Sequence, residues 1–167
     1  MKNILLAMAV SGVWAPLACA ETIQVARSIP YAEEAEIAGK IMRECKLQTQ
    51  LPEYIKIFGA KHGHSIELVD ALDEASEGKE LVVEIRDAVS EGNAFLGHHK
   101  STSARGKLLE NGVEVANFKV RRNSMGGAFA GYKGSCSVLG RTVKIMGEDI
   151  AKWLAAPSKD ALLGDLQ

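Results

Sequence analysis

Apolar residues recur at steps of three and four positions near the C-terminus, which is the clearest pattern in the chain. The stripe consists of Cys136, Leu139, Val143, Met146, Ile150 and Trp153. This spacing places the side chains on one face of an α-helix. Gly140 and Gly147 lie beside the stripe and would allow another backbone to approach closely. Pro157 marks the end of the predicted helix.

Two further helices are predicted in the first third of the chain. Residues 31–48 repeat apolar side chains four positions apart, at Ile37, Ile41 and Cys45. Glutamates are enriched in the first turns of this segment, where they suit the positive end of the helix dipole. Pro52 is well placed to begin a second helix, which Gly63 would stop.

Alternation of apolar and polar residues predicts strands at residues 22–28, 64–72 and 80–89. The apolar face of the third strand is expected to consist of Leu81, Val83, Ile85 and Val89. Ala88 is expected on the opposite face. Residues 90–93 have the composition and the length of a hairpin turn.

The dipeptide Asn111-Gly112 is the strongest turn signal, because both residues tolerate the positive φ that a tight hairpin requires. It joins two predicted strands at residues 102–109 and 113–120. The inward face of the second arm stays open, since apolar residues occur in both of its alternating sets.

The order strand, helix, helix, four strands, helix predicts an α+β protein. We expect an antiparallel β-meander sheet with the N-terminal and C-terminal helices packed on one face, and one disulfide. The length suits a single domain over residues 21–157. Residues 158–167 are expected to form a C-terminal tail, either frayed or with a short extra turn.

The first 20 residues have the layout of a secretory signal peptide. Lys2 precedes about ten apolar residues, too few for the roughly 20 that span a bilayer. Small residues of the type that signal peptidase reads end at Ala20. Cleavage there predicts a periplasmic protein, and no later segment is apolar enough to span a membrane.

Cys19 leaves a second processing route open. The segment APLAC resembles a bacterial lipobox, in which a cysteine becomes the lipidated first residue. Pro16 departs from that motif, which usually carries an aliphatic residue at this position. We therefore favour simple cleavage after Ala20 over a lipid-anchored form.

Either route leaves Cys45 and Cys136 available for pairing. In an oxidising compartment an even pair indicates one disulfide. The bond would close a long loop, to which the chain-entropy model assigns about 4–5 kcal/mol. The alternative is a nucleophilic cysteine beside a histidine, which needs an activated thiolate.

The charge balance argues against a nucleic-acid partner. The chain has 20 Lys and Arg residues against 21 Asp and Glu residues, a net charge of −1, and only 5% aromatic residues. It therefore has neither a global positive field nor many side chains on which bases could stack.

The glycine-rich residues 126–134 precede the last helix and raise the question of a phosphate cradle. They lack the G-x-x-x-x-G-K-[ST] pattern, and no βαβ unit surrounds them. We interpret them as a crossover that delivers Cys136 to Cys45, with Ser135 as an N-cap. The chain also lacks the G-x-S-x-G and H-E-x-x-H motifs, so no catalytic residue is predicted.

The four histidines form two nearby pairs, His62 with His64 and His98 with His99. Imidazole binds zinc and copper, so converging pairs would make a metal site. Each pair lies in a predicted turn, where exposed histidines are common. No cofactor is therefore predicted, and a metal or small ligand at the histidine turns is the alternative.

A basic strip is predicted at the end of the last strand, and consists of Lys119, Arg121 and Arg122. Hairpin pairing would bring some of these residues close to Lys100, Arg105 and Lys107. An anionic lipid head or an acidic partner could bind there. The other interpretation is that the charges protect an edge strand from aggregation.

Three features in residues 80–155 carry a resemblance to known proteins: Gly126-Gly127, Cys136, and residues 141–154, which end in GEDIAKWL. With them the segment resembles a group of small exported proteobacterial proteins of unknown function. The order of elements is more distantly similar to envelope accessory lipoproteins whose helices cover a sheet. The resemblance implies a fold and a compartment, but no activity.

Export, the lack of a catalytic motif and the hairpin strands together predict a non-enzymatic periplasmic accessory or binding protein of the cell envelope. Its partner is expected to be an envelope protein or a ligand of unknown identity. The alternative is a periplasmic protein that binds a metal or a small ligand through the histidine turns.

Overall fold

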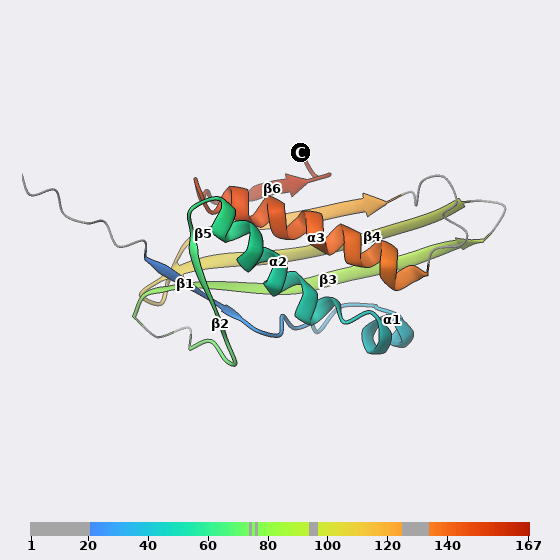
Figure 1. Cartoon of the computed structure of the whole chain (residues 1–167), viewed down its shortest axis with the longest axis horizontal. Helices are drawn as coiled ribbons and strands as arrows, with labels where there is room; N and C mark the ends of the chain where they lie inside the picture. The colour runs from blue at the N-terminus through green and yellow to red at the C-terminus, as the bar shows by residue number, and fades with distance from the viewer. Residues whose placement is uncertain (1–20, 74, 76, 94–96, 125–133) are drawn as a thin grey trace, which may run out of the picture.

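The computed structural model describes residues 21–73, 75, 77–93, 97–124 and 134–167. The elements are, in order, β1 (Thr22–Ala26), α1 (Gly39–Glu44), α2 (Leu47–Lys61), β2 (Ser65–Val69), β3 (Lys79–Asn93), β4 (Gly97–Glu110), β5 (Val113–Ser124), α3 (Ser135–Trp153) and β6 (Ala161–Gly164). The predicted α+β class is confirmed. Helices α2 and α3 lie side by side across one face of the sheet (Figure 1).

The sheet has six strands in the order β2-β1-β3-β4-β5-β6. Its centre, β3-β4-β5, is the antiparallel meander that the sequence predicts. The outer pairings are parallel instead: β1 lies parallel to both β2 and β3, and β6 lies parallel to β5. Helices α1 and α2 connect β1 to β2, and α3 connects β5 to β6, because parallel neighbours need a crossover connection.

The β4–β5 hairpin turns at Asn111 and Gly112, with φ angles of 51° and 77°, as the sequence predicts. The Asn111 side-chain oxygen also accepts the backbone N–H of Gly78 at 2.8 Å, which ties the turn to the start of β3. The open question about the second arm is settled, because Phe118 and Val120 are buried on the helix side.

The alternation of β3 changes at a β-bulge around Arg86. Ile85 pairs with Ala104, and the next paired residue is Asp87, so one residue is inserted into the strand. Beyond the bulge Ala88 is buried among the core residues. The prediction that Val89 lies on the core face with Ala88 opposite is therefore wrong, since one extra residue exchanges the two faces.

The predicted turn at residues 90–93 is also wrong, because β3 continues to Asn93, which pairs with Gly97. Residues with the composition of a turn stay in the strand here because the antiparallel ladder still provides partners for their backbone groups.

The predicted helix over residues 31–48 is mostly absent, since α1 covers only Gly39–Glu44. Before α1 the chain runs beside β3: the Ile85 N–H donates to Pro30, and the Ala32 N–H donates to the Ile85 carbonyl. Strand β1 pairs with β3 only as far as Leu81. The segment thus satisfies backbone groups of β3 that β1 does not reach.

Helix α2 begins at Leu47 and contains Pro52, which the sequence places at a helix start instead. Proline has no backbone N–H, so it cannot donate to the carbonyl four residues earlier. That carbonyl, on Gln48, accepts the N–H of Ile29 at 3.0 Å. The proline therefore leaves an acceptor free, and the chain after β1 uses it.

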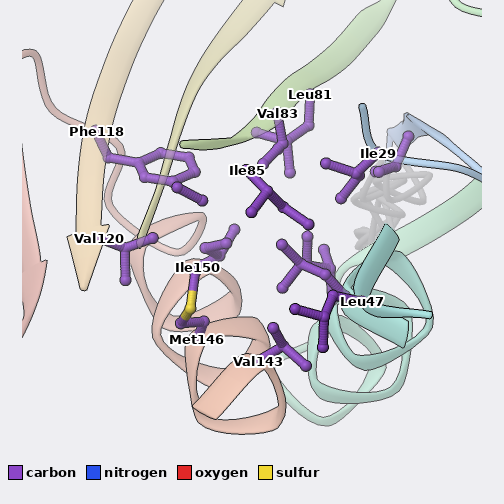
Figure 2. Packing of buried hydrophobic residues seen from close by; sticks show 14 of the residues in the cluster. Ile29, Leu47, Leu81, Val83, Ile85, Phe118, Val120, Val143, Met146 and Ile150 are labelled. Carbon is purple, nitrogen blue, oxygen red and sulfur yellow. The ribbon is translucent and has the colours of Figure 1, made fainter. Parts of the chain in front are cut away.

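Side chains from the sheet, α2 and α3 meet in one core (Figure 2). Leu81, Ile85 and Val120 come from the sheet and pack against Leu47 of α2 and Met146 of α3. At one end of this layer the predicted disulfide is formed. Its Cys45 and Cys136 sulfurs are 2.05 Å apart, so the end of α1 is joined to the start of α3.

Strand β6 lies within residues 158–167, for which the sequence predicts a C-terminal tail and no strand. Leu163 is buried and pairs with Val120 of β5. Only four residues make this strand. A segment so short is defined by its pairing with β5 rather than by its own alternation.

Close approach of α2 and α3 at Gly147 gives a first prediction. A Cβ on Gly147 would lie 2.6 Å from the Tyr54 Cβ and 3.0 Å from its carbonyl carbon. We expect Gly147→Ala to lower the free energy of unfolding by about 1–3 kcal/mol, because the helices must move apart. Urea denaturation monitored by circular dichroism measures the change.

Gly140→Ala is the matched control in the same helix. Its Cβ would meet only the end of the flexible Gln50 side chain, at 3.0 Å. Alanine is the better helix former by about 1 kcal/mol, so this change should be neutral or stabilising. Equal destabilisation by both substitutions would contradict the role given to Gly147.

Candidate functional site

The helices cover one face of the sheet, and the opposite face carries charged side chains from three strands. We call this opposite side the outer face. Arg105 of β4 lies between Glu84 of β3 and Lys119 of β5, its two register partners. It forms an ion pair with Glu84 and another with Glu34 from the segment before α1.

Two adjoining depressions lie on the outer face. The first has a volume of about 470 Å³ and is lined by residues that include Glu84, Arg105, Gly106, Asn117 and Lys119. The second has a volume of about 660 Å³ and is lined by residues that include Glu34, Arg86, Ser103, Lys119 and Arg121. Lys119 lines both, so the two depressions adjoin across β3, β4 and β5, and we call them together the outer-face hollow.

Glu34 organises the cations on one side of this hollow. Its carboxylate contacts Arg86 at 3.0 Å and Arg105 at 3.3 Å. A hydrogen bond from its own backbone N–H lowers the pKa of Glu34, and Arg105 and Arg86 lower the pKa further. Lys119 and Arg121 have no carboxylate partner within the described part of the chain, although Glu36 and Asp87 line the same depression as both cations.

The predicted basic strip is divided between the two faces. Lys119 and Arg121 point to the outer face, together with Arg105. Arg122, the next residue along, points to the helix side, because neighbouring strand residues alternate. There it donates to both carboxylate oxygens of Asp149, at 2.6 and 2.7 Å. The structure thus brings two of the three predicted residues together and uses the third inside the fold.

Arg122 is the centre of a clamp that fastens the C-terminal residues. It also donates to Asp165 at 2.9 Å, and the second oxygen of Asp165 accepts the Asn123 backbone N–H at 2.6 Å. The hydrogen bond to Asp149 raises the pKa of Arg122, and Asp165 contributes in the same direction. Asp165 has a lowered pKa because it accepts the Asn123 N–H and faces Arg122.

The two histidine pairs lie at opposite ends of the sheet. His64 immediately precedes β2. Strands β2 and β3 both pair with β1, and the two registers place the start of β2 at the same height in the sheet as the start of β3. His98 and His99 are strand residues rather than turn residues, and pair with the far end of β3. At the rise per residue of a β-strand, the start of β3 lies about 40 Å from the residues of β3 that pair with His98 and His99. The backbone therefore does not bring the pairs together.

His64 has a buried environment of its own. Its Nε2 is buried and has no hydrogen-bond partner in the described residues. Burial lowers the pKa of His64, and the neighbouring His62 adds to the effect. Within the same described residues, no three His, Cys, Asp or Glu side chains are grouped to hold a metal ion.

Two of the predicted features lie outside the described residues, namely the cleavage site at Ala20 with Cys19 and the glycine-rich residues 126–133. Gly134 is described and is the N-cap of α3, so Ser135 is the first helical residue and not the cap that the sequence suggests. Because Cys45 and Cys136 are joined, neither is available as the thiolate nucleophile of the alternative interpretation.

Comparisons with known proteins show similarity in fold. No family model matches the chain, and no curated protein matches it. Protein XCC0632 from Xanthomonas campestris, a DUF330 protein, is 12% identical with a TM-score of 0.54, over 87% of this chain and 91% of that one. The two proteins share a fold at this level of similarity.

Two other solved structures are similar over comparable lengths. A PelC dodecamer from Paraburkholderia phytofirmans is 12% identical, with a TM-score of 0.48 over 83% of this chain and 93% of that one. A minor lipoprotein from Acinetobacter baumannii is 9% identical, with a TM-score of 0.48 over 82% of this chain and 94% of that one.

No helix in the described residues has the length and apolarity needed to cross a bilayer.

The Arg122 clamp predicts a pH-dependent contribution to stability. Asp165 has a lower pKa folded than unfolded, so its contribution is present above the unfolded pKa of about 4 and is lost as the pH falls through the folded pKa. Asp165→Asn should cost about 2 kcal/mol of unfolding free energy at pH 7. Denaturation at several pH values should show this cost shrinking at about pH 3.

Asp70→Asn is the control for this experiment. Asp70 also pairs with an arginine, Arg27 at 3.0 Å, but its side chain is 94% exposed. An exposed pair contributes only about 0–1 kcal/mol, so this substitution should have little effect at any pH. A cost of Asp165→Asn that is equal at pH 3 and pH 7 would refute the linkage.

Proposed function

We propose that this chain is a non-enzymatic accessory or binding protein of the bacterial cell envelope, and that it acts in the periplasm after removal of residues 1–20. The disulfide between Cys45 and Cys136 supports export, because such bonds persist in oxidising compartments. The fold shared with XCC0632 is compatible with the proposal but specifies no activity.

The outer face is the observation that carries the binding role. Helices α2 and α3 cover the inner face of the sheet (Figure 1). The outer face instead has a hollow that crosses three strands. A hollow formed on a sheet surface suits an extended segment of a partner better than a small enclosed substrate. Lys119 and Arg121 supply the positive charge, so the partner we propose is an acidic segment of an envelope protein.

Arg86 and Arg105 are already paired with carboxylates, so they contribute hydrogen-bond donors at fixed positions rather than net positive charge. Glu34 holds Arg86 and Arg105 in place, and Glu84 also engages Arg105. These guanidinium groups keep unused N–H donors, since each has five. A partner carboxylate would thus meet two free cations beside donors whose positions are already fixed, which lowers the entropy lost on binding.

Charge reversal on the outer face tests this proposal. The double variant Lys119→Glu with Arg121→Glu should reduce partner recovery from envelope extract by about tenfold or more, because attraction becomes repulsion. Chemical crosslinking followed by affinity purification and mass spectrometry measures the recovery.

The double variant Lys56→Glu with Lys159→Glu is the matched control. Both lysines are exposed, and neither lines the outer-face hollow. This variant has the same net charge as the test variant, so it separates a local effect from a change in overall charge. Equal recovery by the two variants would exclude the outer face as the binding surface.

Processing of the exported chain supplies a separate prediction. Mass spectrometry of the protein purified from the periplasm should give an N-terminus at Glu21 and no free thiol, because cleavage follows Ala20 and the remaining cysteines are joined. An acylated N-terminus at Cys19 would instead establish the lipid-anchored form.

A further inference from the structure

A polar cluster lies on the inner side of the sheet, where α3 begins. Ser135 is the first residue of α3, and its hydroxyl oxygen accepts hydrogen bonds from Ser90 of β3 at 2.8 Å and from the Lys100 ammonium of β4 at 3.1 Å. Ser90 and Lys100 are register partners on neighbouring strands. Three elements thus direct polar side chains to one point.

Lys100 is the unusual member of this cluster, because the residue is only 4% exposed. An ammonium group loses hydration when it is buried, and a negative partner normally offsets that cost. Lys100 has no carboxylate partner in the described residues. Its one described bond is to a neutral hydroxyl, and two of its three N–H donors remain for another acceptor.

The start of α3 adds further donors and no acceptor. The N–H groups of Ser137 and Val138 bond to the Gly134 carbonyl, so those of Ser135 and Cys136 are the ones directed beyond the helix end. Gly134 provides no capping side chain, and the first turn of α3 contains no acidic residue. The positive end of a helix of 19 residues therefore points toward the same place as Lys100.

A depression of about 380 Å³ between α1, β3 and α3 reaches the cluster at Ser90 and Ser135. Lys100 does not line the depression, but its ammonium bonds to the Ser135 hydroxyl of a residue that does. Ser90, Gly134, Ser135 and Cys136 line one side of it. Ile41 and Cys45 line the other, with the charged Lys40 and Glu44 also at its wall. The disulfide between Cys45 and Cys136 joins the two sides of the depression.

We propose that this cluster binds an oxyanion of the phosphate class. The Lys100 ammonium, the Ser135 hydroxyl and the N–H groups of Ser135 and Cys136 would donate to its oxygens. A tetrahedral oxyanion supplies several acceptors and the negative charge that the cluster lacks. The site lies on the helix side of the sheet, so it is independent of the outer-face binding surface.

Titration with inorganic phosphate at constant ionic strength tests the site. The amide signals of Ser135 and Cys136 should shift in ¹H–¹⁵N spectra of the exported, disulfide-bonded protein, and sodium chloride alone should not shift them. Lys100→Met should weaken phosphate binding by about tenfold or more, because it removes the buried charge and keeps the length of the side chain.

Two controls keep the result interpretable. Lys159→Met removes an exposed lysine after α3 and should leave phosphate binding unchanged. Ser135→Gly is a second site variant, which removes the shared hydroxyl without adding bulk and should also weaken binding. Unchanged phosphate binding in Lys100→Met would overturn the proposal. It would also be overturned if the wild-type protein showed neither a shift of the Ser135 and Cys136 amide signals with phosphate nor binding to phosphatidic acid vesicles.

The phosphate group could belong to a free ligand or to a lipid headgroup, and vesicles distinguish the two. Phosphatidylcholine vesicles with and without phosphatidic acid serve as probes, with sedimentation as the readout. Lys100-dependent binding of inorganic phosphate alone supports a free ligand. Lys100-dependent binding to the phosphatidic acid vesicles supports a lipid headgroup.

Discussion

The packing of α3 against the central strands is the interaction on which the rest of the fold depends. Met146 and Ile150 are fully buried against the sheet, and Gly147 lets α2 lie close beside them. Because α3 covers part of the inner face, two polar groups of the sheet find their partners on that helix. Thr102 does so through Thr142, at 2.8 Å, and Arg122 does so through Asp149.

The elements with a strong local pattern could be predicted from the sequence, whereas those defined by tertiary pairing could not. The stripe of α3 and the turn at Asn111 identify themselves through spacing and residue type alone. The bulge at Arg86 carries no such signal, and it changes which face every later residue of β3 occupies. Residues 31–38 have helical composition, but at Tyr31 and Ala32 pairing with β3 prevails over that preference.

The candidate sites also combine features with a local sequence pattern and features that depend on tertiary pairing. The residue types of the basic strip are evident in the sequence, but the face of each residue depends on knowing which side of β5 is buried. Once Phe118 and Val120 are placed inward, alternation puts Arg122 inward and Arg121 outward. The association of Lys100 with Ser135 joins a strand to a distant helix, and no local pattern indicates it.

The position of the disulfide also has a consequence for the order of folding. Strands β3, β4 and β5 are neighbours in sequence, so their pairing requires only short loop closures and is expected to form early. Cys45 and Cys136 lie on opposite sides of this meander in the chain, with a separation of 91 residues. Their oxidation therefore closes a loop that contains the whole meander.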